Sequence, residues 1–277
     1  MLTLGHSPDP DDAFLTYPII SRKIPYPLGI DIREIVLDIE TLNKLAIVER
    51  IDITAASVGA YLIVSKKYLL IPYGASIGYD YGPKLLIRKV DRNGTVVAVP
   101  GKYTTARILT EIYLREEKNI ENIKLIDVQF EKIKDLVIDG LVDCGVLIHE
   151  EQMESFNIEN IDLGRWWKKR TGLPIPLGVD IVHERVGTET AREISEMFRK
   201  AIEYSYRNVD EVLKHAMRYS RLRDPEKVLQ FIKMYVKDTK LTRESPEVRA
   251  MIELHRLCKR RDIRPFSETE LDIRIIE

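Results

Sequence analysis

The sequence predicts an α/β protein with parallel sheets covered by helices, followed by a helical C-terminal segment. Short apolar or β-branched runs alternate with helical patterns through the first two thirds of the chain, which is typical of parallel sheets. The last third carries helical patterns alone. A chain of 277 residues is long enough for two lobes of ordinary size or for one large α/β domain.

Each expected strand is a short run rich in Val, Ile or Leu. The expected strands are MLTLGH, IDIREIVL, IDITAAS, KYLLIPYG, PKLLIRK, TVVAVP, IKLIDVQ, CGVLIH and LGVDIVHE. The expected helices between them lie near residues 11–22, 40–49, 57–65, 103–118 and 131–140. In open α/β sheets a ligand binds outside the carboxyl ends of the strands, so residues at those ends are the candidates for a site.

The expected C-terminal helices have recognisable first turns. Asp224-Pro225-Glu226 and Ser245-Pro246-Glu247 each combine a capping side chain, a proline at the first helical position and an acid that faces the helix dipole. Thr190 and Glu193 have the spacing of a capping box. The apolar residues that follow lie on one helical face: Ile194, Phe198, Ala201 and Ile202.

Composition excludes several classes of protein. Lys and Arg number 43 against 44 Asp and Glu, so a net charge of -1 gives no general attraction for nucleic acid or for an anionic membrane. No apolar run approaches the roughly 20 residues of a membrane helix, and the N-terminus has no signal-peptide pattern. With only Cys144 and Cys258, we expect a cytoplasmic protein. Charged residues at 31% hint at a thermophile.

The stretch LGHSPDPDDAF, residues 4–14, places acidic side chains at the end of the first strand. Asp9-Pro10-Asp11-Asp12 has the form of a helix start, because Asp caps helices and Pro is favoured in the first turn. The same carboxylates stand where a ligand is expected. Both roles stay open, and we predict that Ser7, Asp11 and Asp12 belong to a binding site.

Two other strand ends have residues suited to a ligand. In VAVPGKYTTAR a Pro-Gly turn leads into a helix that starts at Thr104-Thr105, where free N–H groups and two hydroxyls suit a carboxylate or phosphate. In ITAASVGAY the small residues Ala55, Ala56 and Ser57 would let a ligand approach the main chain. The structural alternatives are an ordinary N-cap in the first stretch and tight packing in the second.

His149 follows the apolar strand CGVLIH and precedes two glutamates. An unperturbed imidazole has a pKa of about 6.5, so a histidine at a strand end is a usable base near neutral pH. His6, at the end of the first strand, is a rival candidate. The remaining histidines lie in a charged strand end or on helices, where structural roles are expected: His183, His215 and His255.

Trp166 and Trp167 are the only tryptophans and precede the stiff segment GLPIPLG. Such a segment is typical of a connector between lobes, with the tryptophans packed in the interior. The alternative is an aromatic wall for a ring-shaped ligand.

The segments SPDPDDAF, ETLNKLA, VPGKYTTA, LIHEE and RTGLPIPLG occur in this order between residue 4 and about residue 180. Together they resemble the 1,4-dihydroxy-6-naphthoate synthases of the futalosine route to menaquinone. The resemblance implies a periplasmic-binding-protein-like type II fold, in which two α/β lobes joined by two crossing segments enclose a ligand. The crossings would make residues 1–88 plus 183–277 lobe one and residues 89–182 lobe two.

The family's substrate is cyclic dehypoxanthine futalosine, a small carboxylated molecule that is split to 1,4-dihydroxy-6-naphthoate and a three-carbon product. The resemblance implies that His149 is the base, that 55–57 and 104–105 bind substrate, and that no cofactor or metal is required. Asp11 or Asp12 could also bind sugar-derived hydroxyls. Asp11 replaces an Asn of the family and Ala55 replaces a Lys of some members, so the pocket is expected to be more negative.

Two alternatives use the same fold. Chorismate dehydratase, a sister enzyme of the same route, would use the same cleft with a different acid. A non-catalytic solute-binding or sensor protein would bind a ligand without turnover and without dependence on His149. The sequence does not indicate an oligomeric state.

Overall fold

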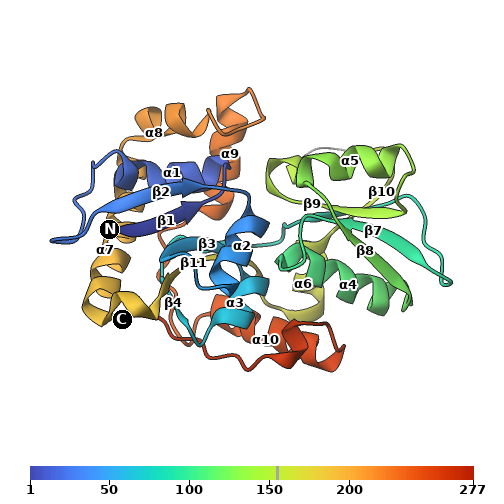
Figure 1. Ribbon diagram of the computed structural model, residues 1–277. Helices are drawn as coiled ribbons and strands as arrows, with labels where there is room; N and C mark the ends of the chain where they lie inside the picture. Colours follow the sequence, from blue (N-terminus) through green and yellow to red (C-terminus); the bar gives the residue numbers. More distant parts are fainter. Residues whose placement is uncertain (154–155) are drawn as a thin grey trace.

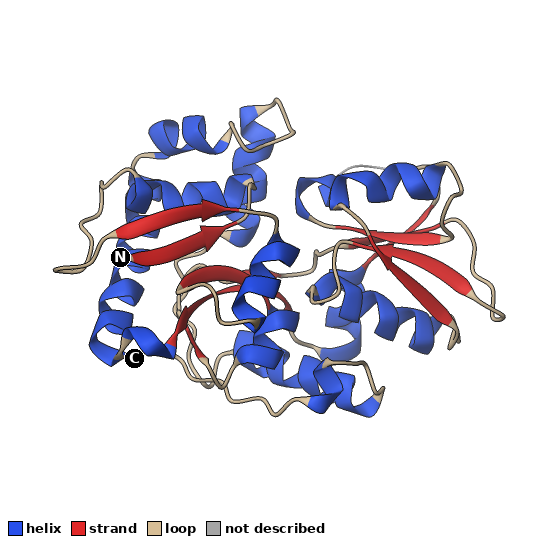
Figure 2. Cartoon of the chain, viewed as in Figure 1, coloured by secondary structure: helices blue, strands red, loops and turns tan. Residues whose placement is uncertain are grey.

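Two separate β-sheets form the centres of two lobes, which lie side by side in the computed structural model (Figures 1 and 2). The structure describes residues 1–153 and 156–277. The first sheet has the order β2-β1-β3-β11-β4, with β5 paired to β11, and the second has the order β10-β6-β9-β7-β8. The strands of the first sheet are β1 (Leu2–His6), β2 (Ile32–Val36), β3 (Ile53–Ser57), β4 (Tyr68–Leu70), β5 (Ser76–Gly78) and β11 (Ile175–His183). Those of the second are β6 (Lys84–Ile87), β7 (Thr95–Val99), β8 (Ile123–Asp127), β9 (Cys144–Leu147) and β10 (Glu159–Asp162).

Each sheet combines a parallel centre with antiparallel crossing strands. β1 is parallel to β2 and β3, and β7 is parallel to β8 and β9, as the alternation of strands and helices predicts. β11 runs antiparallel to β3, and β6 runs antiparallel to β9. These two strands carry the chain from one lobe into the other. The fold class predicted from the sequence is therefore confirmed, with a mixed rather than a purely parallel sheet in each lobe.

Helices cover both faces of each sheet. In lobe one, α1 (Pro10–Ile20), α7 (Thr188–Arg207), α8 (Val209–Ala216) and α9 (Pro225–Tyr235) share one core, which includes Phe14 and Phe198. A second core contains α2 (Ile39–Ile47), α3 (Val58–Val64) and α10 (Pro246–Arg260), and it continues into α4 (Thr105–Glu117) and α6 (Leu163–Thr171) of lobe two. α5 (Phe130–Ile138) covers the remaining face of lobe two.

The boundaries of the lobes differ from the expected division at 88/89 and 182/183. β6 pairs with β9 and β10, so the second sheet already begins at Lys84. All of β11 from Ile175 pairs with strands of lobe one. The physical reason is that each crossing segment is itself a strand, and hydrogen bonding places it in the sheet that it enters.

Two of the three expected C-terminal helix starts are found, and the third is wrong. α9 begins at Pro225, with the Asp224 carboxylate accepting a hydrogen bond from the N–H of Glu226, and α10 begins at Pro246. The predicted capping box at Thr190 and Glu193 lies inside α7, which begins at Thr188 after Gly187. A glycine with a φ of +85° ends the preceding turn, so the helix starts before the threonine can cap it.

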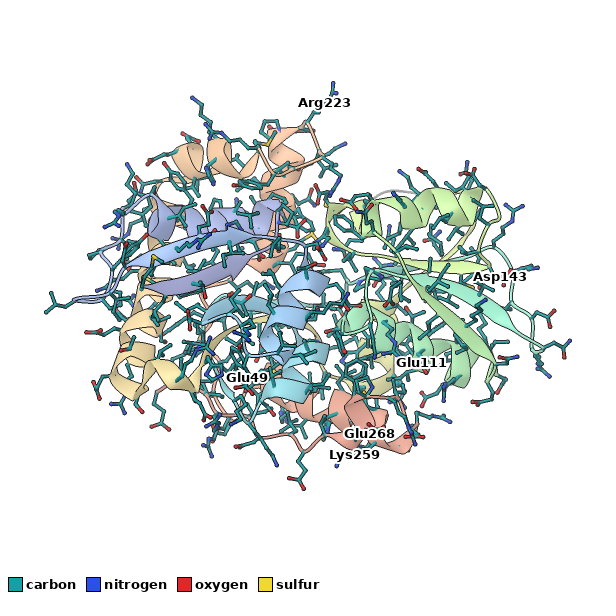
Figure 3. The ribbon with its side chains drawn as sticks, viewed as in Figure 1. Glu49, Glu111, Asp143, Arg223, Lys259 and Glu268 are labelled. Carbon is teal, nitrogen blue, oxygen red and sulfur yellow. The ribbon has the colours of Figure 1, made fainter. Side chains whose placement is uncertain are left out.

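Charged side chains project from both lobes, with Arg223 pointing outward at the edge of lobe one (Figure 3). Glu116 instead joins the lobes, because it accepts hydrogen bonds from Arg170 of α6 and from Arg260 and Arg261 at the end of α10. Burial alone would raise the pKa of Glu116, but these guanidinium groups lower it to about 2. None of the described helices is both long and apolar enough to cross a membrane.

Gly101 lies in the turn between β7 and α4, where lobe two comes close to α2. Its φ is +154°, and a Cβ atom at this position would lie 2.4 Å from Cγ of Glu40. The Glu40 carboxylate accepts a hydrogen bond from the N–H of Tyr103 at 3.0 Å. The missing side chain therefore permits a direct contact between the lobes.

Replacing Gly101 by Ala should lower the free energy of unfolding by about 1–3 kcal/mol, because Glu40 would have to move. Gly94→Ala is the matched control, since its Cβ would meet Asn122 only at 3.4 Å, an ordinary contact. Thermal denaturation of the two variants measures the difference. Equal midpoints would contradict the close-contact explanation.

Candidate functional site

A cavity of about 760 Å³, including its open mouth, lies between the two lobes. The nine residues that the sequence analysis assigned to the binding site or as the base implied by the resemblance all line it: Ser7, Asp11, Asp12, Ala55, Ala56, Ser57, Thr104, Thr105 and His149. They come from the carboxyl ends of β1, β3, β7 and β9, so the strand-end argument correctly brought them together.

His149 begins the short 3-10 helix η1 (His149–Met153), two residues after β9 ends. Its φ is +56°, a left-handed conformation that a histidine adopts at a cost of about 1–2 kcal/mol. The ring packs edge-on against Phe130, with ring centroids 4.6 Å apart. Its Nδ1 lies 3.1 Å from Oδ2 of Asp9. Strained backbone that the surroundings hold in place is a common feature of functional sites.

Asp9 is the partner of His149 that the sequence analysis did not nominate. It occupies the N-cap position of α1, yet its side chain makes no capping hydrogen bond. Its carboxyl group instead contacts Ser7 and His149, and it is only 1% exposed. Burial raises the pKa of Asp9, and the contacts with His149 and Ser7 offset this only in part. The helix-start pattern was therefore correct for the backbone, but this carboxylate belongs to the site.

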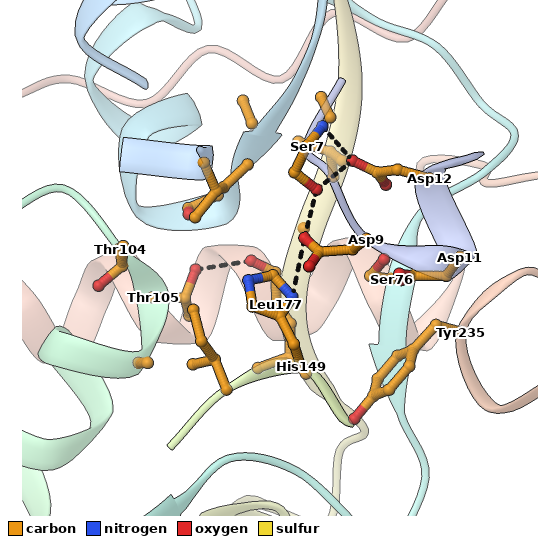
Figure 4. Close-up of a pocket in the computed structure, with 18 of the residues that line it drawn as sticks. Ser7, Asp9, Asp11, Asp12, Ser76, Thr104, Thr105, His149, Leu177 and Tyr235 are labelled. Carbon is orange, nitrogen blue, oxygen red and sulfur yellow. Dashed lines mark hydrogen bonds and ion pairs between the residues drawn. The ribbon is translucent and has the colours of Figure 1, made fainter. Parts of the chain in front are cut away.

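Ser7 lies between two carboxyl groups. Its Oγ is 2.5 Å from Oδ2 of Asp9 and 2.6 Å from Oδ2 of Asp12, and its N–H donates to the same Asp12 oxygen at 2.8 Å. A hydroxyl has one proton, so Ser7 Oγ can donate to only one of the two carboxyl groups at a time. Figure 4 shows the resulting chain of contacts from Asp12 through Ser7 and Asp9 to His149.

The threonines at the start of α4 contact the protein rather than presenting free hydroxyl protons. The Thr104 hydroxyl donates to the carbonyl of Gly101, and the Thr105 hydroxyl donates to the carbonyl of Leu177 across the cavity edge (Figure 4). Among the described residues, the N–H groups of Thr105 and Ala106 have no partner. The donors at this corner are therefore main-chain N–H groups at a helix N-terminus, not the hydroxyls that we expected.

The corner between β3 and α3 presents small side chains to the cavity. Ala55, Ala56 and Ser57 all line it. The side chain of buried Asn43 holds Ser57, accepting from its N–H at 2.9 Å and donating to its Oγ at 3.1 Å. The hydroxyl proton of Ser57 is not used in these contacts, so it remains available to a ligand.

Several lining residues escaped the sequence analysis. Asp180 comes from β11 and Gln152 from η1, while Phe231 and Tyr235 come from α9 in the helical segment that showed no motif. The Tyr235 hydroxyl donates to Oε1 of Gln152 at 3.0 Å, which joins the two lobes. An acid inside the apolar run LGVDIVH was a signal for Asp180, but the aromatic residues of α9 follow the same spacing as core residues.

The tryptophans and the remaining histidines have structural roles. Trp167 is fully buried and donates to the carbonyl of Pro174, and neither tryptophan lines the cavity, so the aromatic wall is not found. His6, the rival base, is buried and contacts Glu34 through Nε2. The other three lie outside the cavity lining: His183, His215 and His255.

The wall that lobe one contributes is acidic. Burial raises the pKa of Asp11 well above its ordinary value, and the neighbouring Asp12 and Asp9 raise it further. Burial and the charge of Asp12 do the same for the pKa of Asp180. No Lys or Arg is found among the described residues that line the cavity. A ligand therefore meets hydrogen-bonding acids on one side and the N-terminus of α4 on the other.

Solved structures of binding proteins share this architecture. The periplasmic aliphatic sulphonate binding protein of Escherichia coli superposes with a TM-score of 0.66 over 100% of this chain and 93% of its own, at 11% identity. A protein from Archaeoglobus fulgidus has a TM-score of 0.85 and 32% identity, covering 95% of this chain and 98% of its own. The chain thus has the periplasmic-binding-protein-like fold, with its cavity between the two lobes.

Sequence comparisons are more specific. The menaquinone biosynthesis family matches residues 2–260. A protein of Thermus thermophilus named 1,4-dihydroxy-6-naphtoate synthase is 30% identical over 240 residues, 85% of each chain. One of the same name from Streptomyces coelicolor is 26% identical over 242 residues, 86% of this chain and 85% of its own. The chain belongs to the menaquinone biosynthesis family, and the resemblance predicted from its motifs is confirmed. It is an enzyme of that biosynthesis.

Proposed function

We propose that the protein is a carbon–carbon lyase that converts cyclic dehypoxanthine futalosine to 1,4-dihydroxy-6-naphthoate, with His149 as general base. The observation that carries the proposal is the pairing of His149 with Asp9 inside the cavity, since a base needs both access to the substrate and a fixed orientation. The names and coverage of the two relatives support the choice of reaction.

The proton transfer follows from the geometry of the pair. With Asp9 beside Nδ1, a proton on that nitrogen leaves Nε2 as the acceptor for a proton of the substrate. Phe130 restricts the ring from the other side. Removal of a hydroxyl proton lets its oxygen form a carbonyl while the carbon–carbon bond breaks. The released electron pair passes into the ring system, which becomes an aromatic naphthalene.

One part of the cavity offers hydrogen-bond donors and another offers apolar surface, and this difference orients the substrate. The N–H groups of Thr105 and Ala106 at the start of α4 suit the carboxylate of the substrate, because the helix dipole and free donors both favour an anion. Leu177, Phe231 and Tyr235 supply apolar and aromatic surface for the rings. Contacts between the lobes around the cavity, such as Tyr235 with Gln152, limit access of water to the reacting atoms.

One assay distinguishes the proposal from its alternatives. The purified protein is mixed separately with cyclic dehypoxanthine futalosine and with chorismate, and products are detected by mass spectrometry. We expect 1,4-dihydroxy-6-naphthoate from the first and no dehydration of the second. Turnover of chorismate alone would indicate the dehydratase. Tight binding of either compound without turnover would indicate a solute-binding protein and would contradict the proposal.

A further inference from the structure

Asp180 is an acid at the centre of a sheet with no partner of its own. It lies on β11 opposite Ala55 of β3, between the buried apolar residues Val179 and Ile181. Its side chain is 6% exposed, lines the cavity, and makes no hydrogen bond or ion pair with any described residue. A buried carboxyl group without a partner costs several kcal/mol, so an acid that lines a cavity in this way is suited to a hydrogen bond from a ligand or water.

The residues around Asp180 leave space for its side chain but provide no opposite charge. Gly74 faces it with a φ of +81°, and a Cβ atom on that glycine would lie 2.6 Å from Oδ2 of Asp180. Among the described residues, the charged group that shifts the pKa of Asp180 is the carboxyl group of Asp12, which is also acidic. Asp11 adds an unsatisfied atom to the same wall, because its buried Oδ1 has no hydrogen-bond partner among the residues that the structure describes.

The chemistry of this wall selects among possible occupants. Among the described residues no group of His, Cys, Asp or Glu has an arrangement that could hold a metal ion. Burial raises the pKa values of Asp11 and Asp180, which favours the neutral carboxyl groups and disfavours a cation as the occupant. A neutral carboxyl group both donates and accepts a hydrogen bond, and an alcohol hydroxyl does the same.

We propose that Asp180, together with Asp11 and Asp12, forms a subsite for a neutral polyhydroxylated part of the ligand. This inference deepens the proposed function and rests on it for the identity of the full substrate. The wall would hold the hydroxyl-bearing end, while the carboxylate end lies at the N-terminus of α4. Asp180 is then a residue that determines specificity, since the naphthoate product lacks the hydroxylated part.

The test compares Asp180→Ala and Asp180→Asn with Asp238→Asn, an exposed aspartate outside the cavity lining. Asp180→Ala should raise KM for cyclic dehypoxanthine futalosine by about 10–100-fold, the range for hydrogen bonds to a buried polar group. Affinity for 1,4-dihydroxy-6-naphthoate, measured by calorimetry, should stay unchanged. The thermal midpoint should be retained or raised, because an unpartnered buried acid is removed. A structural role would lower the midpoint and both affinities together, which would overturn the proposal.

A second measurement does not depend on turnover. Weak binding of ribose, followed by saturation-transfer NMR, should occur with the wild-type protein and with Asp238→Asn and be lost in Asp180→Ala. Ribose binding that persists in the variant, or binding of ethanolamine in place of ribose, would refute the polyol subsite even if the lyase reaction is observed. If Asp180→Ala does not fold, Asp180→Asn carries the test, because the amide has the shape of the protonated acid and should weaken ribose binding several-fold.

Discussion

Turnover by the His149→Asn variant should be about 10²–10⁴-fold slower than that of the wild type, the usual contribution of a general base. Asn is the appropriate replacement because it tolerates the left-handed φ of +56° at this position better than Ala does. The amide cannot accept the proton, so kcat should fall much more than KM changes. Product formation followed by mass spectrometry and the thermal midpoint of the variant together measure the effect.

His215→Asn is the matched control for this variant. His215 lies on α8 outside the cavity lining, so this change should leave turnover intact. Asp9→Asn should slow turnover by a smaller factor, and the Asp9→Asn, His149→Asn double variant should be no slower than His149→Asn alone, since Asp9 acts through the imidazole. Near-normal rates in folded His149→Asn would show that another group is the base.

Stability should rise as the pH falls through the raised pKa values of Asp11 and Asp180, the reverse of the usual behaviour of paired acids. Asp11 and Asp180 have pKa values well above 3.8 in the folded protein, mainly because they are buried. Over the pH window between 3.8 and those raised values, the folded protein therefore binds more protons than the unfolded chain. Each such carboxyl group contributes a slope of up to about 1.4 kcal/mol per pH unit.

Three histidines also have shifted pKa values. The pKa of His6 is raised, because its contacts with Glu34 and Asp12 outweigh burial, so it stabilises the fold below its folded pKa and adds to the same trend. Burial lowers the pKa values of His215 and His255, so these two groups oppose the trend below about pH 6.5. Glu116, with a pKa of about 2, loses its stabilising contribution only as the pH falls below its ordinary pKa of 4.5. Asp11→Asn should flatten the profile and raise the free energy of unfolding at pH values above the pKa of Asp11, whereas Asp238→Asn should change neither. Urea denaturation at a series of pH values measures the free energy of unfolding of each protein. A free energy of unfolding that increases with pH would contradict this explanation.

Local sequence patterns were sufficient to predict most of the secondary structure. Runs such as TVVAVP and CGVLIH correspond to β7 and β9, because the periodicity of a buried strand is a property of a few neighbouring residues. Elements with weak local signals were missed, namely β5, β10 and α6. β5 has only three residues, β10 is the polar sequence ENID, and α6 precedes a stiff proline-containing segment that dominated the interpretation.

The nine nominated site residues could be found from the sequence because each follows a strand, and the ends of parallel strands meet at one edge of a sheet. The residues that contact them in the site could not be found in this way. Asp9 has the same local sequence whether it caps a helix or contacts an imidazole 140 positions away along the chain. Asp180, Phe231 and Tyr235 enter the cavity only because β11 pairs with β3, α9 packs against α1, and the second lobe closes over them. Which groups contact one another, and which acids lack a partner, depends on distances that only the folded chain creates.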